Sequence, residues 1–188
     1  MKALLAKIQQ CRLCEKTLPL EPNPILQISE NSKTLILGQA PGVKAHQTST
    51  PFDDQSGLRL RAWLGVTKAQ FYDDQLFAII PMSFCYPGKG KSGDLPPLPQ
   101  CADTWREALL TKLSNVELTI LLGKYATEWY LNSKEPITTL AQQWRTLLNS
   151  NQIVLPHPSP RNNIWLKKNA WFETEVIPNL QQKIKEIV

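Results

Sequence analysis

The sequence of 188 residues contains no apolar run of the roughly 18 residues that a membrane-spanning helix requires. Its first ten residues carry Lys2 and Lys7 and no long apolar segment, so we expect an amphipathic helix there rather than a secretory signal peptide. We therefore expect a cytoplasmic protein without a membrane partner. The sequence also shows no internal repeat and no linker, which predicts a single domain over residues 1–188, and we expect this domain to be a monomer.

Cysteine and histidine are both scarce, with four cysteines and two histidines in the chain. Cysteines in a reducing compartment rarely form structural disulfides, so we expect these four to be free thiols or metal ligands. Charged residues make up 20% of the sequence, as in ordinary folded proteins, which excludes a disordered chain. The net charge of +5 suits a partner that carries phosphates, although many basic proteins bind no nucleic acid.

Short apolar segments alternate with segments of helical spacing along the chain. The apolar segments predict strands at residues 34–38, 76–80, 117–123 and 152–156. The helical spacing predicts helices over residues 1–17, 56–64, 102–113, 124–131 and 137–148, and from 165 to the C-terminus. Residues 81–100 are rich in Pro, Gly and Lys and predict a long irregular loop. This order predicts an α/β fold, a three-layer α/β/α sandwich around a four-stranded parallel sheet.

The loop that follows the first predicted strand is a candidate ligand site, because ligands of parallel sheets bind beyond the carboxyl ends of the strands. It begins with residues 38–42, Gly-Gln-Ala-Pro-Gly, in which the glycines allow close approach to a ligand and Pro41 stiffens the turn. Phe52 either offers a stacking surface for a planar ring or packs under its own loop. Asp53 and Asp54 stand before a predicted helix, where N-capping accounts for at least one of them.

A second candidate loop follows the last predicted strand. Three prolines fix the path of this segment, which carries His157, Ser159, Arg161 and Asn162. Both histidines of the chain, His46 and His157, are expected in loops at strand ends. A lone histidine is usually structural, but one held between prolines at a strand end is a candidate for the site. A rigid polar loop in this place can approach a phosphate or open a duplex.

The four cysteines have a spacing that is compatible with a metal site. Cys11 and Cys14 form a C-x2-C pair, and Cys85 and Cys101 begin and end the long irregular loop. A shared metal centre would give this loop the order that it otherwise lacks. Zinc and a [4Fe–4S] cluster are equally compatible with four thiolates, and four unrelated buried thiols are the simpler alternative. A structural role is the default for such a set.

Together these features resemble the uracil-DNA glycosylase superfamily over nearly the whole chain, and most of all its family-4 iron–sulfur branch. Residues 38–42 resemble that branch's G-E-x-P-G loop, and Pro51, Phe52 and Gly57 match its P-F-x-x-x-x-G continuation. The family type also appears in Lys124-Tyr125-Ala126 after the third strand, and its second motif resembles His157-Pro-Ser-Pro160. The family's four cluster ligands are similar in order and spacing to Cys11, Cys14, Cys85 and Cys101. The resemblance implies a four-stranded parallel sheet and favours a [4Fe–4S] cluster over zinc.

The function that the resemblance implies is base excision repair: the protein would flip uracil or another deaminated base out of DNA and excise it by hydrolysis. Phe52 would then stack on the flipped ring, and His157 would hydrogen-bond the oxygen on which charge develops. Arg161 would contact a phosphate or fill the vacated stack. The residues expected around the base are Gly38, Ala40, Pro41 and Gly42, and those expected on the DNA are Lys44, Ser159, Arg161 and Asn162.

Two positions depart from the family pattern. Gln39 stands where the family has an acidic residue, and glutamine cannot act as a general base. Pro81 stands where the family has an asparagine that binds the uracil edge. We expect Asp54, with Asp53 in reserve, to activate water instead, and Ser83 or a nearby backbone group to bind the base. The departures also keep open a module of the same fold that binds damaged DNA without hydrolysis, and an enzyme for RNA or nucleosides.

Overall fold

A computed structural model of the chain describes residues 1–91 and 93–188. Its centre is a four-stranded sheet with the order β2-β1-β5-β6, in which all neighbouring strands are parallel. The strands are β1 (Thr34–Gly38), β2 (Phe77–Pro81), β5 (Leu118–Leu122) and β6 (Gln152–Leu155). Each lies within the segment predicted for it, or within one residue of it, because buried parallel strands are continuous apolar runs.

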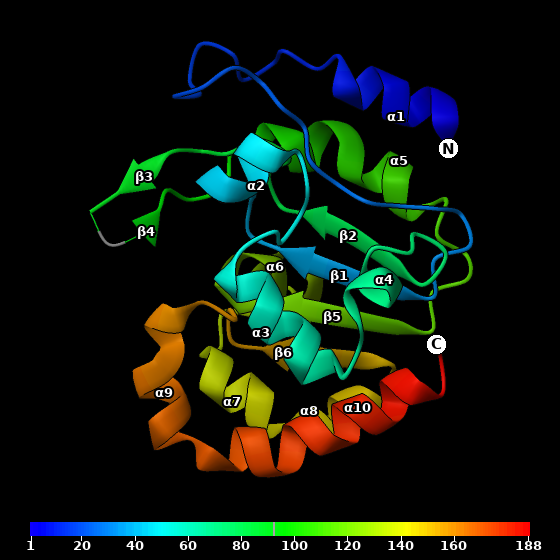
Figure 1. The fold of residues 1–188 in the computed structure, drawn as a ribbon, viewed down its shortest axis with the longest axis vertical. Coiled ribbons are helices and arrows are strands. Elements are labelled where there is room, and N and C mark those ends of the chain that lie inside the picture. Colours follow the sequence, from blue (N-terminus) through cyan, green and yellow to red (C-terminus); the bar gives the residue numbers. More distant parts are fainter. Residues whose placement is uncertain (92) are drawn as a thin grey trace.

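Helices cover both faces of the sheet, which confirms the three-layer α/β/α sandwich (Figure 1). Successive side chains of β1 point to opposite faces, so Ile36 packs in one apolar core while Leu35 and Leu37 pack in the other. The first core is closed by α3 (Gln55–Leu64), α8 (Trp144–Asn149), α9 (Asn163–Lys168) and α10 (Ile177–Lys185). The second is closed by α1 (Lys2–Gln9), α5 (Glu107–Leu110), α6 (Gly123–Leu131) and α7 (Ile137–Gln142).

The remaining elements are short. They are α2 (Val43–Thr48), α4 (Lys68–Phe71), the π-helical turns Ala102–Arg106 and Phe172–Val176, the 3-10 turn Pro160–Asn162, and an antiparallel hairpin of β3 (Lys89–Gly90) and β4 (Gly93–Asp94). In the described part of the chain, no helix combines the length and the apolar character of a membrane span.

Several predicted boundaries are wrong. The N-terminal helix ends at Gln9 instead of residue 17, and the chain then turns and places Cys11 and Cys14 beside the other two cysteines. His46 lies in the helix α2 rather than in a loop, since that helix has no apolar periodicity to reveal it. The loop predicted for residues 81–100 contains the β3–β4 hairpin. The last two predicted helices are each interrupted, near Gln143 and Asn169.

Candidate functional site

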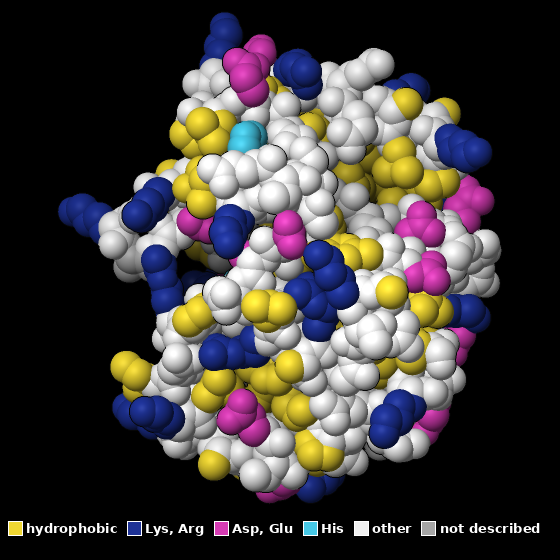
Figure 2. All heavy atoms as spheres, viewed as in Figure 1, with side chains coloured by type: hydrophobic (Ala, Val, Ile, Leu, Met, Phe, Trp, Pro, Cys, Tyr) yellow, Lys and Arg dark blue, Asp and Glu magenta, His cyan; other side chains and the backbone are white. Residues whose placement is uncertain are grey.

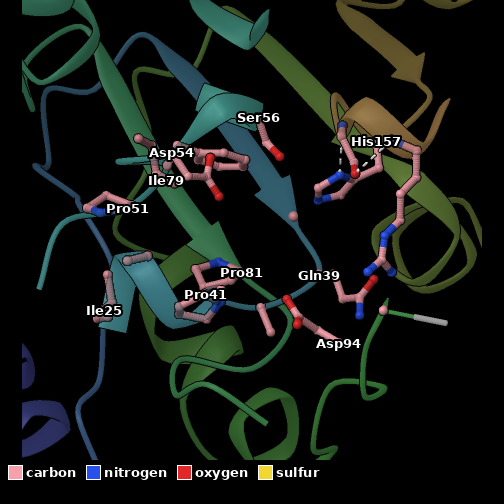
Figure 3. Close-up of a pocket in the computed structure, with 18 of the residues that line it drawn as sticks. Ile25, Gln39, Pro41, Pro51, Asp54, Ser56, Ile79, Pro81, Asp94 and His157 are labelled. Atoms are coloured by element: carbon pink, nitrogen blue, oxygen red, sulfur yellow. Dashed lines mark hydrogen bonds between the residues drawn. The ribbon is translucent and has the colours of Figure 1, made fainter. Parts of the chain in front are cut away.

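A cavity of about 520 Å³ opens at the carboxyl ends of β1, β2 and β6 (Figure 3). We call it the base cavity, after the ligand that the family resemblance implies. Of the residues predicted for the site, it is lined by Gly38, Gln39, Ala40, Pro41, Gly42, Phe52, Asp54, His157, Ser159, Arg161 and Asn162. The structure therefore brings the two loops together around one space, as their positions at strand ends predict. Asp53, Lys44 and Ser83 do not line it.

The spacing of Phe52 and Gly57 follows from backbone geometry. Phe52 has a left-handed backbone with φ of 54°, which is uncommon for a non-glycine residue. Its carbonyl group lies so close to Gly57 that a Cβ atom on Gly57 would overlap the oxygen. The Asp54 carboxylate accepts a hydrogen bond of 2.9 Å from the Gly57 N–H and caps α3. N-capping therefore accounts for Asp54, although this residue also lines the cavity.

The Phe52 ring packs on the core behind its loop and also lines the base cavity. One side packs edge-on against Phe71, with ring centroids 6.2 Å apart. The ring also lies beside Gly38, where a Cβ atom would be 3.5 Å from Cζ. The cavity-lining part of the ring is thus held by the core behind it, which gives a planar ligand a fixed surface.

His157 is oriented by its own loop. Its Nδ1 accepts a hydrogen bond of 3.2 Å from the Ser159 N–H, and its carbonyl oxygen accepts one of 2.6 Å from the Asn162 side chain. Burial lowers the pKa of His157, and the nearby Asp54 charge opposes this only in part. A neutral imidazole whose Nδ1 is an acceptor carries its proton on Nε2, so the free edge of the ring is a hydrogen-bond donor.

At the end of β2, the side chain of Pro81 lines the base cavity, whereas that of Ser83, two residues later, does not. Pro81 lines the base cavity, and its carbonyl oxygen accepts a hydrogen bond of 2.8 Å from Arg106. Ser83 is fully buried, and its hydroxyl donates to the Cys85 carbonyl at 3.3 Å. Ser83 therefore faces the cysteines, and the structure does not bring it to the base as predicted. The reason is that the strand ends at Pro81 and the chain bends over residues 82–85, so the alternation of the strand does not continue to Ser83.

Sequence reasoning missed the contribution of the β3–β4 hairpin to this cavity. Gly93 and Asp94 line it beside Arg161, whose guanidinium lies where a Cβ atom on Gly93 would be. Gln39 donates a hydrogen bond of 3.0 Å from its side chain to the Leu95 carbonyl, which ties the first loop to the hairpin. Partial burial raises the pKa of Asp94, and the Arg161 charge opposes this. No pattern in the sequence indicates that Asp94 lies near Gln39.

The four predicted metal ligands meet at a second, much smaller cavity of about 10 Å³, which we call the cysteine cavity. It is lined by Cys11, Cys14, Cys85 and Cys101 together with Trp105, Ser83 and apolar side chains. Burial raises the pKa of Cys85 to about 12 and raises those of Cys14 and Cys101. Among the residues described, no three or more His, Cys, Asp or Glu side chains are arranged around a single metal ion. The buried Trp105 indole N–H has no hydrogen-bond partner there.

Basic side chains stand around the base cavity. Figure 2 shows Lys and Arg side chains on both sides of a hollow in the surface next to the hairpin. Lys44, Lys89 and Arg161 are exposed, and Arg59 donates to the Ser159 carbonyl at 3.0 Å and to the Asn163 side chain at 2.7 Å. Arg59 therefore braces the second loop from α3, while the exposed cations suit a phosphate backbone.

One comparison with known proteins assigns the chain. The sequence model of the family described as "Uracil DNA glycosylase superfamily" matches residues 26–181. The matched segment contains all four strands of the parallel sheet and both loops of the base cavity. Cys85 and Cys101 fall within it, whereas Cys11 and Cys14 precede it.

Proposed function

The chain belongs to the uracil DNA glycosylase superfamily, and from this we propose that it releases uracil or another deaminated base from DNA by hydrolysing the N-glycosidic bond. The observation that carries the proposal is that the Phe52 ring and the His157 imidazole border one cavity at the carboxyl ends of the sheet. Stacking and a directed hydrogen-bond donor are what recognition of a flipped base needs.

The reaction leaves an anionic base and a cationic sugar, so stabilisation of the leaving base is the first requirement. The Nε2–H of His157 would hydrogen-bond the base oxygen on which negative charge develops, a contribution of about 3–4 kcal/mol in comparable sites. The lowered pKa of His157 supports this role, because protonation of Nδ1 would break its hydrogen bond from Ser159. Phe52 would stack on the ring while Phe71 supports it from behind.

Contacts to the DNA backbone fit the exposed cations near the mouth. Arg161 and Lys44 would contact phosphates, and Ser159 lies next to Arg161 on the second loop, where its hydroxyl accepts the Arg161 N–H. The side-chain amide of Asn162 is bonded to the His157 carbonyl, so this residue supports the loop rather than reaching out to DNA. Binding through phosphates should weaken steeply as salt rises.

For the cysteine cavity we propose a structural [4Fe–4S] cluster, as in the family-4 branch, with Cys11, Cys14, Cys85 and Cys101 as ligands. Each cysteine of such a cluster binds a different iron, so the four sulfurs need not surround one ion as they would around zinc. The unpartnered Trp105 N–H fits an anionic group in this cavity, since cluster and cysteine sulfurs accept hydrogen bonds. A brown anaerobic preparation that contains iron and sulfide supports the cluster. A colourless protein with stoichiometric zinc overturns it.

The experiment that tests the main proposal is base release from an oligonucleotide panel, with uracil, hypoxanthine or xanthine placed in single- and double-stranded DNA. Release of free base supports a glycosylase. Gln39 and Pro81 favour a second candidate, a damage-binding module, because Gln39 does not supply the acid expected at its position and Pro81 does not supply the amide expected at its own. Tight, salt-sensitive binding without release would establish that module. Activity on RNA or nucleosides alone would contradict both.

A further inference from the structure

Two carboxylates border the base cavity on either side of Gly42. A Cβ atom on Gly42 would lie 3.6 Å from Oδ2 of Asp94 and 3.8 Å from Oδ2 of Asp54. Because Gly42 has no side chain, this space is open to the cavity. Figure 3 shows Asp94 next to Gln39 at one edge of the cavity and Asp54 farther round it. A small polar group held there would have two acceptors.

Contacts of the β3–β4 hairpin hold Asp94 at this point. The side chain of Gln39 donates to the carbonyl of Leu95, the residue that follows Asp94. On the other side, the Arg161 guanidinium packs on the backbone of Gly93, where any side chain would displace it. The neighbours of Asp94 are thus fixed to both loops of the cavity, and its carboxylate stands beside the glutamine that cannot accept a proton.

We propose that Asp94 and Asp54 hold the attacking water beside Gly42, and that Asp94 accepts its proton. This inference rests on the proposed glycosylase function. The oxygen of the water bonds to C1′ of the deoxyribose, and the N-glycosidic bond breaks with its electron pair leaving on the base. One proton of the water passes to the Asp94 carboxylate, and the base anion is stabilised by the Nε2–H of His157. Later transfer of a proton to the base restores Asp94.

The two carboxylates are not equivalent. Oδ1 of Asp54 already accepts the Gly57 N–H and caps α3, so this carboxylate is held in a fixed position. For Asp94, partial burial and the Asp54 charge raise the pKa, while the cations Arg161 and Lys89 act in the opposite direction. Asp94 is therefore better suited to accept the proton, and Asp54 to orient the water.

The first test is single-turnover base release by Asp94→Asn. We expect a rate reduced about 100-fold or more, as for loss of a general base, with the affinity for substrate DNA unchanged. The matched control is Glu173→Gln, which removes one exposed negative charge from the turn Phe172–Val176, away from the cavity lining, and should release base at the wild-type rate. Formate should restore part of the rate to Asp94→Ala, which a merely structural role of Asp94 would not allow.

Gly42→Ala provides an independent test of the water position. Gly42 has an ordinary backbone conformation with φ of −78°, so the chain tolerates alanine, but the methyl group enters the space between the carboxylates. We expect base release to slow by about tenfold, equivalent to a modest displacement of a reacting group. Wild-type rates in Asp94→Asn would overturn the inference and leave the glycosylase proposal intact. A wild-type protein that releases no base from the whole panel would remove both.

Discussion

The base cavity and the cysteine cavity lie on opposite sides of the segment that follows β2. Pro81 lines the first and Ser83 the second. The base cavity is roomy, open to solvent and bordered by polar groups that leave hydrogen-bonding atoms available. The cysteine cavity is nearly filled, and its thiols are mostly buried. One region is built to admit a ligand and the other to hold segments of the chain together. Mutations in the base cavity should therefore change base release, and mutations in the cysteine cavity should change the melting temperature.

The largest expected effect lies in the cysteine cavity. Cys85→Ser removes a ligand from the proposed cluster and leaves a buried hydroxyl among thiols. We expect loss of bound iron and a fall in melting temperature on the order of 10 °C, because metal binding contributes directly to folding. Calorimetry and iron analysis would measure both.

Cys85→Ser that keeps the wild-type melting temperature would show that the four thiols hold no structural metal. As a control, Thr104→Ser changes an exposed residue of the neighbouring π-helical turn and should leave both observables unchanged.

In the base cavity, the largest effect is expected from His157. His157→Ala should reduce single-turnover base release by about 100- to 1,000-fold, since it removes the donor for the developing charge. The melting temperature should change little in comparison with Cys85→Ser. The comparison between the regions fails if His157→Ala unfolds the protein, or if it releases base at the normal rate. The affinity of His157→Ala for product DNA should also be measured, because an unchanged affinity would show that the variant affects hydrolysis and not DNA binding.

A smaller effect is expected for the stacking surface. Phe52→Leu keeps apolar contact with Phe71 but removes the flat ring, so we expect about tenfold weaker capture of a flipped base. Fluorescence of a base analogue placed in the duplex would report the flipped state. The control is Phe52→Tyr, which keeps the ring. Equal capture by the leucine and tyrosine variants would mean that Phe52 serves only to pack under its loop.

The smallest effect concerns pH. Burial lowers the pKa of His157 below its ordinary 6.5, so the unfolded chain takes up a proton at this site before the folded protein does. The contribution of His157 to the free energy of unfolding is therefore complete above about pH 6.5 and is lost as the pH falls from there through the lowered pKa. Denaturant titrations should show a steeper acid-side loss for wild type than for His157→Asn. Parallel curves would contradict the lowered pKa.

The sequence predicted the sheet and both loops of the base cavity well, because each depends on local signals. Apolar runs mark buried strands, and residues 38–42 and 157–160 carry the glycines and prolines that a rigid turn at a strand end needs. The convergence of the four cysteines was also predicted, from spacing and resemblance. Whether they bind a cluster remains a prediction.

Asp94 and the turn after Gln9 could not be predicted in this way. Asp94 reaches the cavity through a hairpin of two-residue strands, which is too short to show an alternating pattern. The helix that was expected to run to residue 17 has suitable residues for its whole length, and the packing of Cys11 and Cys14 beside Cys85 and Cys101 is a long-range contact that no local pattern shows. Ser83 was misplaced for a related reason: its side depends on the path of the chain after β2, which no local pattern fixes.

The order of segments along the chain sets the order in which the two regions become complete during synthesis. The last cysteine is residue 101, so all four cysteines are synthesised before β5 and β6. His157 follows β6 and is among the last parts of the base cavity to appear. All the side chains that line the cysteine cavity are therefore made before the second loop of the base cavity, so the first region can assemble ahead of the second.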